Sequence, residues 1–173
     1  MSPRSGIRIR AAALGDAGSI ARVHARSWEE AYSSFLPAEV IAARGAPRRL
    51  EQWAGMLAAP PPRHAVLVGE LDGEVVGFAS VGPAEDAQDA VDGSGELHAL
   101  YVSPEHWRRG VGAALLADAE EQLRELDFRR ARLRVLAANE TARRVYERAG
   151  WVASGPDEDF EGAPTLCYRK QLV

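Results

Sequence analysis

Two β-rich runs joined by an Asp-Gly pair constrain the fold of this chain more than any other feature. The first run spans residues 65–71, the second spans residues 74–81, and Asp72-Gly73 lies between them. An Asp-Gly pair favours a two-residue hairpin turn, because that turn needs positive φ at both central residues. We therefore predict a tight antiparallel hairpin. Such a hairpin argues against the strict βαβ order of a nucleotide-binding Rossmann domain.

The rest of the chain alternates between strand-like and helix-like segments. Alternating or β-rich patterns predict strands at residues 7–10, 96–103, 131–136, 151–154 and 165–172. Helical spacing of apolar residues predicts helices at 16–32, in one or two short pieces within 38–57, and at 110–126 and 139–150. Asp16 and Asn139 are expected to cap their helices, and residues 85–95 to form an acidic loop. The order of elements predicts a mixed α/β sheet protein.

Composition limits the class of protein. A length of 173 residues with 46% hydrophobic and 27% charged residues suits one globular domain. The net charge of -4 argues against a nucleic-acid partner, which normally meets a basic surface. No stretch approaches the roughly 18 apolar residues of a membrane span, and the first six residues do not begin a signal peptide. The single cysteine, Cys167, excludes an intrachain disulfide, so a cytoplasmic location is expected.

Residues 97–113 have the pattern of an anion-binding segment. A strand is expected to enter a turn at Ser103-Pro104 and then pass through Gly110-Val111-Gly112 into a helix. Glycines let backbone N–H groups approach a ligand, and a helix N-terminus carries unpaired N–H donors and partial positive charge. With Arg108 and Arg109 beside it, this arrangement suits a phosphate or pyrophosphate. The alternative is a tight turn without a ligand; the pattern is neither a P-loop nor the dinucleotide fingerprint.

The same segment resembles a known motif. Residues 100–116, LYVSPEHWRRGVGAALL, look like the acetyl-CoA-binding motif of the GNAT superfamily of N-acetyltransferases, Gln/Arg-x-x-Gly-x-Gly/Ala, with Trp107 in the Gln/Arg place. Residues 139–151, NETARRVYERAGW, are similar to the family's second cofactor helix. The first strand and helix and the Asp72-Gly73 hairpin also fall where the family has them. The resemblance covers nearly the whole chain, as one N-acetyltransferase domain over residues 1–173.

The resemblance implies a fold and a cofactor site. The fold would be a mostly antiparallel, twisted mixed sheet of about six to seven strands with about four helices, splayed between the fourth and fifth strands. Acetyl-CoA would be the co-substrate, with no metal; its pantetheine arm would pair with the fourth strand and its pyrophosphate would lie on the glycine loop. The cofactor-binding residues expected on this basis are Leu100, Tyr101, Val102, Trp107, Arg108, Arg109, Gly110, Val111, Gly112, Ala113, Asn139 and Tyr146.

Two residues are candidates for proton transfer. Tyr146 matches the family's tyrosine general acid, although it also belongs to an apolar helical stripe and could simply pack. Glu96 lies eleven residues before Trp107, the spacing at which histone-acetylating members carry a glutamate base. Strand alternation predicts that Glu96, His98, Leu100 and Val102 share one face, so His98 or water is an alternative base. Structural roles are the alternative for Glu96 and His98, as plain helix capping is for Asn139.

The acceptor is expected between the first helices and the last strands. Trp28 and Tyr32, with Glu96 and His98, are the candidate substrate contacts, and Phe35 and Trp53 add aromatic surface. Acidic clusters at residues 85–92 and 157–161 would attract a cationic amine if they rim the cleft; otherwise they are only solvated.

The expected reaction is transfer of an acetyl group to a primary amine of a small molecule, by direct attack in a ternary complex. Acetylation of protein or peptide N-termini is the alternative among enzymes. A non-catalytic acyl-CoA sensor is the alternative outside them. Many members of the family are dimers, so a homodimer is a further expectation.

Overall fold

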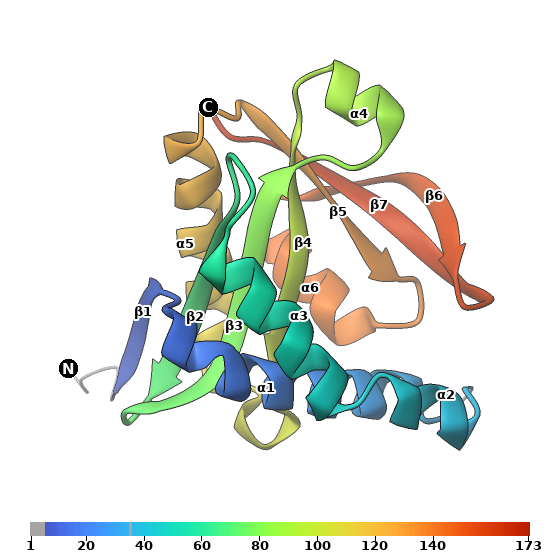
Figure 1. Ribbon diagram of the computed structural model, residues 1–173. Helices are drawn as coiled ribbons and strands as arrows, with labels where there is room; N and C mark the ends of the chain where they lie inside the picture. Colours follow the sequence, from blue (N-terminus) through green and yellow to red (C-terminus); the bar gives the residue numbers. More distant parts are fainter. Residues whose placement is uncertain (1–5, 35) are drawn as a thin grey trace.

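The computed structural model describes residues 6–34 and 36–173, and its centre is one seven-stranded sheet (Figure 1). The strand order is β1-β2-β3-β4-β5-β7-β6, and every pairing is antiparallel except that of β4 with β5. The strands are β1 (Ile7–Ala11), β2 (Ala65–Leu71), β3 (Glu74–Pro83), β4 (Gly95–Val102), β5 (Arg130–Leu136), β6 (Val152–Phe160) and β7 (Ala163–Gln171). The predicted mixed, mostly antiparallel sheet is confirmed.

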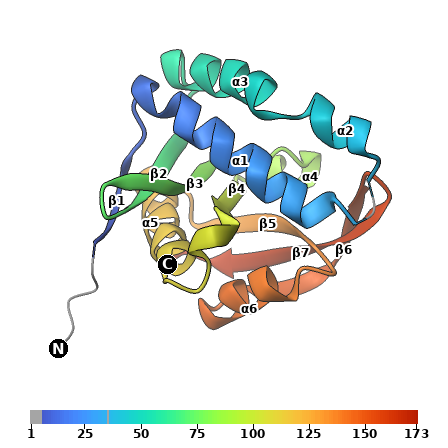
Figure 2. The ribbon, with the colours of Figure 1, turned by 90° about the horizontal axis from the view of Figure 1, so that it is seen from below.

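Helices cover both faces of the sheet. Figure 2 shows α1 and α3 on one face and α5 and α6 on the other. The helices in the described residues are α1 (Ala17–Tyr32), α2 (Ala38–Ala43), α3 (Ala46–Ala58), α4 (Ala87–Val91), α5 (Val111–Glu125) and α6 (Glu140–Arg148), with single 3-10 turns η1 (Leu14–Asp16) and η2 (Pro104–His106). Phe35 and the N-terminal segment considered for a signal peptide lie outside the described residues.

Each face has its own apolar core. On the α1 side, Ile20 and Val23 of α1 and Trp53 of α3 pack against Val68 and Phe78 of the sheet. On the α5 side, apolar residues of α5 and α6 pack against β3, β4 and β5 in a larger cluster that includes Tyr146. The sheet is therefore a middle layer between two groups of helices.

Local turn chemistry accounts for the β2–β3 hairpin. Asp72 and Gly73 have φ values of 52° and 86°, and Leu71 pairs with Glu74. Both central residues thus adopt the positive φ that the primed hairpin turn requires, and the predicted hairpin is confirmed.

Three local predictions were wrong. Asp16 does not cap α1: its carboxylate pairs with both terminal nitrogens of Arg10 at 2.8 and 2.9 Å and accepts the Ala13 N–H at 2.7 Å, in the turn before the helix. Residues 85–95 contain the short helix α4, capped by the Asp86 side chain. The strand expected at 151–154 continues to Phe160, because the β6–β7 hairpin extends through the acidic residues that were expected to form a loop.

Gly77 on β3 allows α5 to approach the sheet closely. A Cβ at this position would lie 3.0 Å from the Leu115 side chain of α5 and 3.0 Å from the Tyr101 carbonyl oxygen of β4. Because one of these neighbours is backbone, the crowding cannot be relieved by a side-chain rotation alone.

We expect Gly77→Ala to lower the free energy of unfolding by about 1–3 kcal/mol, the usual cost of overpacking. Urea denaturation monitored by circular dichroism measures it. Gly55→Ala on α3 is the matched control, since a Cβ there meets nothing within 4 Å and alanine is the better helix former. Equal stabilities of the two variants would contradict the steric explanation.

Candidate active site

The sheet opens between its two parallel strands. β4 and β5 pair only through Gly95, Glu96 and Leu97, which lie opposite residues 131–133. Beyond this point β5 remains paired with β7 and β4 with β3, so the two strands separate along their length (Figure 1). The opening that the family resemblance implied between the fourth and fifth strands is therefore present.

A β-bulge at His98 sets which side chains face the opening from each side. In the β3–β4 ladder Ser80 pairs with Ala99 but Val81 pairs with Leu97, so His98 is the additional residue. The predicted alternation fails here. Glu96, His98 and Tyr101 line a cavity on the α1 side, whereas Leu97, Leu100 and Val102 pack with the α5 core.

The backbone of β4 presents hydrogen-bonding groups to the opening. The Ser103 N–H donates to the Val76 carbonyl at 2.8 Å. Because hydrogen-bonded and non-bonded pairs alternate in an antiparallel ladder, Tyr101 directs its backbone groups to β3, and Leu100 and Val102 direct theirs toward β5. Past Leu97 no strand in the described part of the chain pairs with that edge of β4.

Trp107 approaches the same edge from the glycine loop. Its indole N–H donates to the Val102 carbonyl at 2.7 Å, and the Ser27 hydroxyl donates to the same oxygen at 3.3 Å. About half of the Trp107 surface is exposed. The departure from the Gln/Arg pattern therefore has a structural consequence: the indole ties the loop to the open edge of β4.

The loop before α5 exposes unpaired N–H donors. Arg108 and Gly110 adopt positive φ values of 63° and 89°, which turn the chain into the helix. The hydrogen bonds of helix α5 begin with the N–H of Ala114, which donates to the Gly110 carbonyl at 3.1 Å. The preceding N–H groups, those of residues 111–113, have no intrahelical acceptor. Since the Arg108 and Arg109 side chains are exposed beside them, the loop has the donor set and charge that suit a phosphate.

Tyr146 and Asn139 lie on α6, on the α5 side of the sheet. Burial raises the pKa of the Tyr146 phenol, and the hydroxyl of Tyr101 adds to this effect, so Tyr146 is protonated at neutral pH. The Asn139 side chain accepts the Ala142 N–H at 3.2 Å, so it caps α6 as predicted.

Glu96 and His98 form an acidic end of the α1-side cavity together with Glu85. The Glu96 carboxylate accepts the Glu85 N–H at 3.0 Å, and His98 Nδ1 lies 3.9 Å from oxygens of both Glu85 and Glu96. His98 Nε2 is buried and has no hydrogen-bond partner in the described part of the chain. The His98 ring also stacks on His64, with ring centroids 5.7 Å apart. Either Glu96 or His98 is thus available as a proton acceptor.

The cavity has a volume of about 390 Å³ and is bounded by α1, α3, β4, β5 and the β6–β7 hairpin. Trp28 and Tyr32, both predicted as substrate contacts, line it and stack on each other with centroids 4.4 Å apart. Trp53 is instead a core residue whose indole donates to His24 Nδ1 at 3.1 Å.

Among the lining residues that were not predicted from the sequence, five carry a charge or an aromatic ring. These are His24, Arg44, Arg49, Arg134 and Phe160. Burial is the main cause that lowers the pKa of His24 to about 3, with the Arg49 charge adding to it, so the ring is neutral. Of these, only Arg134 could have been found from the sequence, because the family resemblance places the strand of residues 131–136 beside the opening. The others come from segments that meet only in the folded chain.

Arginines pair with part of the two acidic clusters. Asp89 pairs with Arg169 and Arg132, Asp157 pairs with Arg132, and Glu161 pairs with Arg44. These three carboxylates are therefore paired with arginines, whereas the exposed Glu85 of the first cluster lines the cavity.

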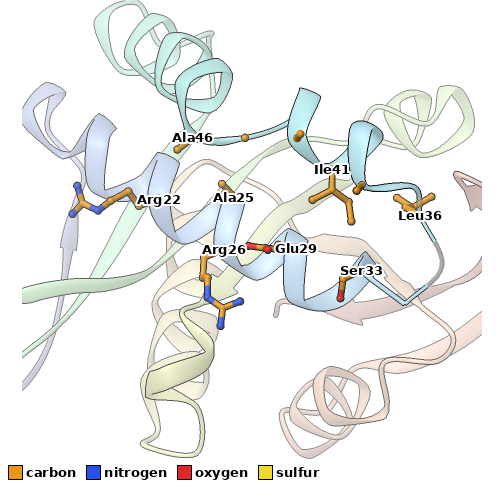
Figure 3. A pocket seen from close by; sticks show the side chains of 11 residues that line it. Arg22, Ala25, Arg26, Glu29, Ser33, Leu36, Ile41 and Ala46 are labelled. Carbon is orange, nitrogen blue, oxygen red and sulfur yellow. The ribbon is translucent and has the colours of Figure 1, made fainter.

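A larger hollow of about 570 Å³ lies elsewhere, between α1 and the α2–α3 segment. Figure 3 shows Arg22, Arg26, Glu29 and Ser33 along α1, with Ile41 and Ala46 facing them from α2 and α3. Its lining includes none of the residues that border the sheet opening, so we do not assign the reaction to it.

Comparison with known proteins identifies the family. The model of the acetyltransferase (GNAT) family matches residues 23–151, so the chain belongs to this family. It is 32% identical to the N-acetyltransferase YuaI of Bacillus subtilis over 70% of this chain and 67% of the relative. It is 26% identical to phosphinothricin N-acetyltransferase of Streptomyces viridochromogenes over 90% and 80% of the two chains.

Solved structures share the fold. The PaiA N-acetyltransferase of Thermoplasma acidophilum, in complex with coenzyme A, has a TM-score of 0.72 at 22% identity and covers 99% of both chains. YncA of Salmonella typhimurium, with acetyl-CoA, has a TM-score of 0.73 at 19% identity and covers 98% of this chain and 95% of its own. In the described residues no helix combines the length and apolar character that a membrane span needs.

Proposed function

We propose that this protein is an N-acetyltransferase that moves the acetyl group of acetyl-CoA to a primary amine of a small molecule, by direct attack in a ternary complex. The observation that carries the proposal is the opening between β4 and β5. It has a helix N-terminus suited to an anion on the α5 side and a cavity with candidate bases on the α1 side. Donor and acceptor would thus approach the same opening from opposite faces of the sheet.

The residues around the opening suit acetyl-CoA. The N–H groups of residues 108–113 would hold its pyrophosphate, and the backbone of Leu100 and Val102 would pair with its amide-containing arm as an added strand. Tyr101 would contribute its side chain, because its backbone faces β3. Trp107 would hold the loop in register with β4, and Asn139 would keep the start of α6 in place.

Bound acetyl-CoA supplies an activated thioester; the chain supplies position and proton transfer. Glu96, or His98 beside it, would accept the proton of the attacking amine, and Tyr146 would donate a proton to the departing thiolate. Holding both reactants in one opening would provide much of the acceleration. The test is release of free CoA thiol from acetyl-CoA with a panel of primary amines. No release with any amine, despite measurable acetyl-CoA binding, would support a non-catalytic sensor instead.

A second candidate function is acetylation of protein or peptide N-termini. The ribosomal-protein-alanine N-acetyltransferase of Brucella melitensis has the same fold, with a TM-score of 0.75 at 23% identity. The small-molecule acceptor is favoured by the cavity, which is lined by aromatic residues and bounded by the β6–β7 hairpin. Peptides with free N-termini belong in the amine panel to separate the two.

We expect the double variant Arg108→Gln/Arg109→Gln to raise KM for acetyl-CoA about tenfold, the scale of one or two lost charge contacts with phosphates. Steady-state kinetics at two salt concentrations measures it, and the variant should show the weaker salt dependence. S-acetylpantetheine, which lacks the pyrophosphate, is the control donor and should have the same KM with both proteins. A similar rise of KM for that donor would exclude the phosphate contact.

We expect Glu96→Gln to lower kcat by about 100-fold at neutral pH and to change the pH–rate profile, since general bases contribute about this much. His98→Gln is the matched variant at the other candidate base. Whichever variant loses activity carries the base role. If both keep the wild-type kcat and profile, water serves as the base.

A further inference from the structure

Three arginines from separate segments border one end of the α1-side cavity. Arg44 follows α2, Arg49 lies on α3 and Arg134 lies on β5. Arg44 pairs with Glu161, whereas Arg49 and Arg134 form no ion pair with any residue in the described ranges. This end of the cavity therefore carries positive charge that the described chain does not neutralise.

The half-buried position of Arg49 disfavours its charged form, because the guanidinium loses contact with water. Its Nε donates to the Arg44 carbonyl at 3.2 Å, and its guanidinium carbon lies 5.8 Å from the Trp28 ring centroid. Burial and the neighbouring Arg44 and Arg48 charges lower the pKa of Arg49, because they disfavour its charged form. A bound anion would relieve this, since a buried charge is stable mainly when it is paired.

Arg44 and Arg134 converge on the same aromatic ring. Their guanidinium carbons lie 5.8 and 5.9 Å from the Phe160 ring centroid. Arg44 Nη1 is buried and has no hydrogen-bond partner among residues 6–34 and 36–173. The charges of Arg49 and Arg134 both act on the Tyr101 hydroxyl, lowering its pKa against the effect of burial. Arg49, Arg134 and Tyr101 all line the same cavity.

The opposite end of the cavity is acidic. It contains Glu85, Glu96 and His98, where β4 and β5 are still paired. Glu96 lies opposite Arg132, and Arg134 lies two residues farther along β5, which is about 7 Å at the usual rise per residue. The cavity thus has groups that attract an amine toward one end and groups that attract an anion toward the other.

We propose that the acceptor is an amino acid or an amino-acid analogue, a primary amine with a carboxylate or similar oxyanion a few bonds from the nitrogen. Arg49 and Arg134 bind the oxyanion, and the nitrogen lies toward Glu96 and His98. This proposal rests on the proposed acetyl transfer and specifies its substrate class. Arginine suits the role because its planar donor fork matches an oxyanion with two parallel hydrogen bonds.

The first test compares acceptors that differ only in the anion. CoA release is measured with the twenty amino acids, their α-amides, the matching amines without a carboxylate, and aminophosphonate analogues. We expect at least one free acid to exceed its amide by about 100-fold in kcat/KM, the effect of one lost charge-assisted contact of about 3 kcal/mol. A higher kcat/KM for an aminophosphonate than for the matching carboxylate would show that the site prefers a tetrahedral oxyanion. Equal rates for acids, amides and simple amines would overturn this inference and leave the proposed acetyl transfer standing.

The second test assigns the anion contact to the arginines. Arg49→Gln and Arg134→Gln should each lower kcat/KM for the acid and leave the rate with its amide nearly unchanged. Arg48→Gln is the matched control, because Arg48 is exposed, adjacent in sequence and absent from the cavity lining. Should Arg49→Gln unfold, the exposed Arg134 still provides the test. Equal losses on acid and amide would indicate a structural role and overturn the assignment.

A binding measurement is independent of turnover. Isothermal titration of N-acetyl amino acids, the expected products, should show binding that Arg49→Gln and Arg134→Gln weaken and Arg48→Gln does not. If no amine is acetylated while acetyl-CoA binds, the proposed function fails, and this titration alone decides the anion site. Absence of binding, or binding indifferent to both arginines, would overturn it.

Discussion

Replacing Tyr146 with phenylalanine is expected to lower kcat by roughly 100- to 1,000-fold, with little change in KM for acetyl-CoA. The phenol is buried, its pKa is raised, and it keeps its proton at neutral pH. The substitution removes a single oxygen, so the packing of the ring against Trp151 and Tyr168 should survive. Steady-state kinetics with a good acceptor, and a thermal melt to confirm the fold, measure the effect.

Tyr168→Phe is the matched control for this prediction. Tyr168 belongs to the same cluster, but its hydroxyl donates to Glu147 at 2.7 Å and accepts from Arg143 at 3.1 Å. Its loss should reduce stability while leaving kcat within a few fold. If Tyr146→Phe retains the wild-type kcat, or if the two variants lose activity equally, Tyr146 is a packing residue and not the general acid.

Replacing Asp89 with alanine is expected to lower the free energy of unfolding by about 3 kcal/mol, within the range for breaking a buried ion pair. Asp89 is buried and bonds Arg169 through both carboxylate oxygens, one of them at 3.0 Å. It also lies 3.5 Å from Arg132, whose buried guanidinium pairs with Asp157 of β6. The network ties α4 to β5, β6 and β7, and a fall in Tm of roughly 6–12 °C should follow.

The contribution of Asp89 should depend on pH with a definite sign. The hydrogen bond from Arg169, aided by the charges of Arg169 and Arg132, holds the pKa of Asp89 below its ordinary value of 3.8. A lowered pKa stabilises the fold above pH 3.8, and the gain is lost as pH falls through the lowered value. The difference in unfolding free energy between wild type and Asp89→Ala should therefore shrink between pH 7 and pH 3.

Arg169→Gln supplies the control for the network. The Arg169 side chain is about half exposed, and its loss leaves Arg132 beside Asp89, so the destabilisation should be smaller than that of Asp89→Ala. A larger loss from Arg169→Gln, or a pH-independent difference for Asp89→Ala, would contradict the buried-pair explanation.

Sequence patterns predicted the structure correctly where it depends on interactions between neighbouring residues. The Asp72-Gly73 turn, the start of α5 after Gly110 and the capping of α6 by Asn139 depend on a few adjacent residues. The capping prediction for Asp16 was wrong even at short range, because Arg10 binds the carboxylate that would otherwise cap the helix.

The bulge at His98 shows a limit of a different kind. Alternation along β4 predicted that Glu96 and Leu100 share a face, yet they lie on opposite sides of the sheet. An inserted residue is defined only relative to the partner strand, so the sequence of β4 alone does not contain it.

The sequence by itself determined the order of elements, the family resemblance and the segment suited to the donor's phosphates, because these depend on periodicity, turn chemistry and one contiguous motif. Only the tertiary structure decided the character of the acceptor cavity. Arg44 follows α2, and Arg49, Arg134 and Phe160 come from α3, β5 and β6. Three of the carboxylates expected to attract a cation, Asp89, Asp157 and Glu161, are paired with arginines distant in the sequence. The charge of a cavity depends on residues from several segments that folding brings together, so no local sequence pattern predicts it.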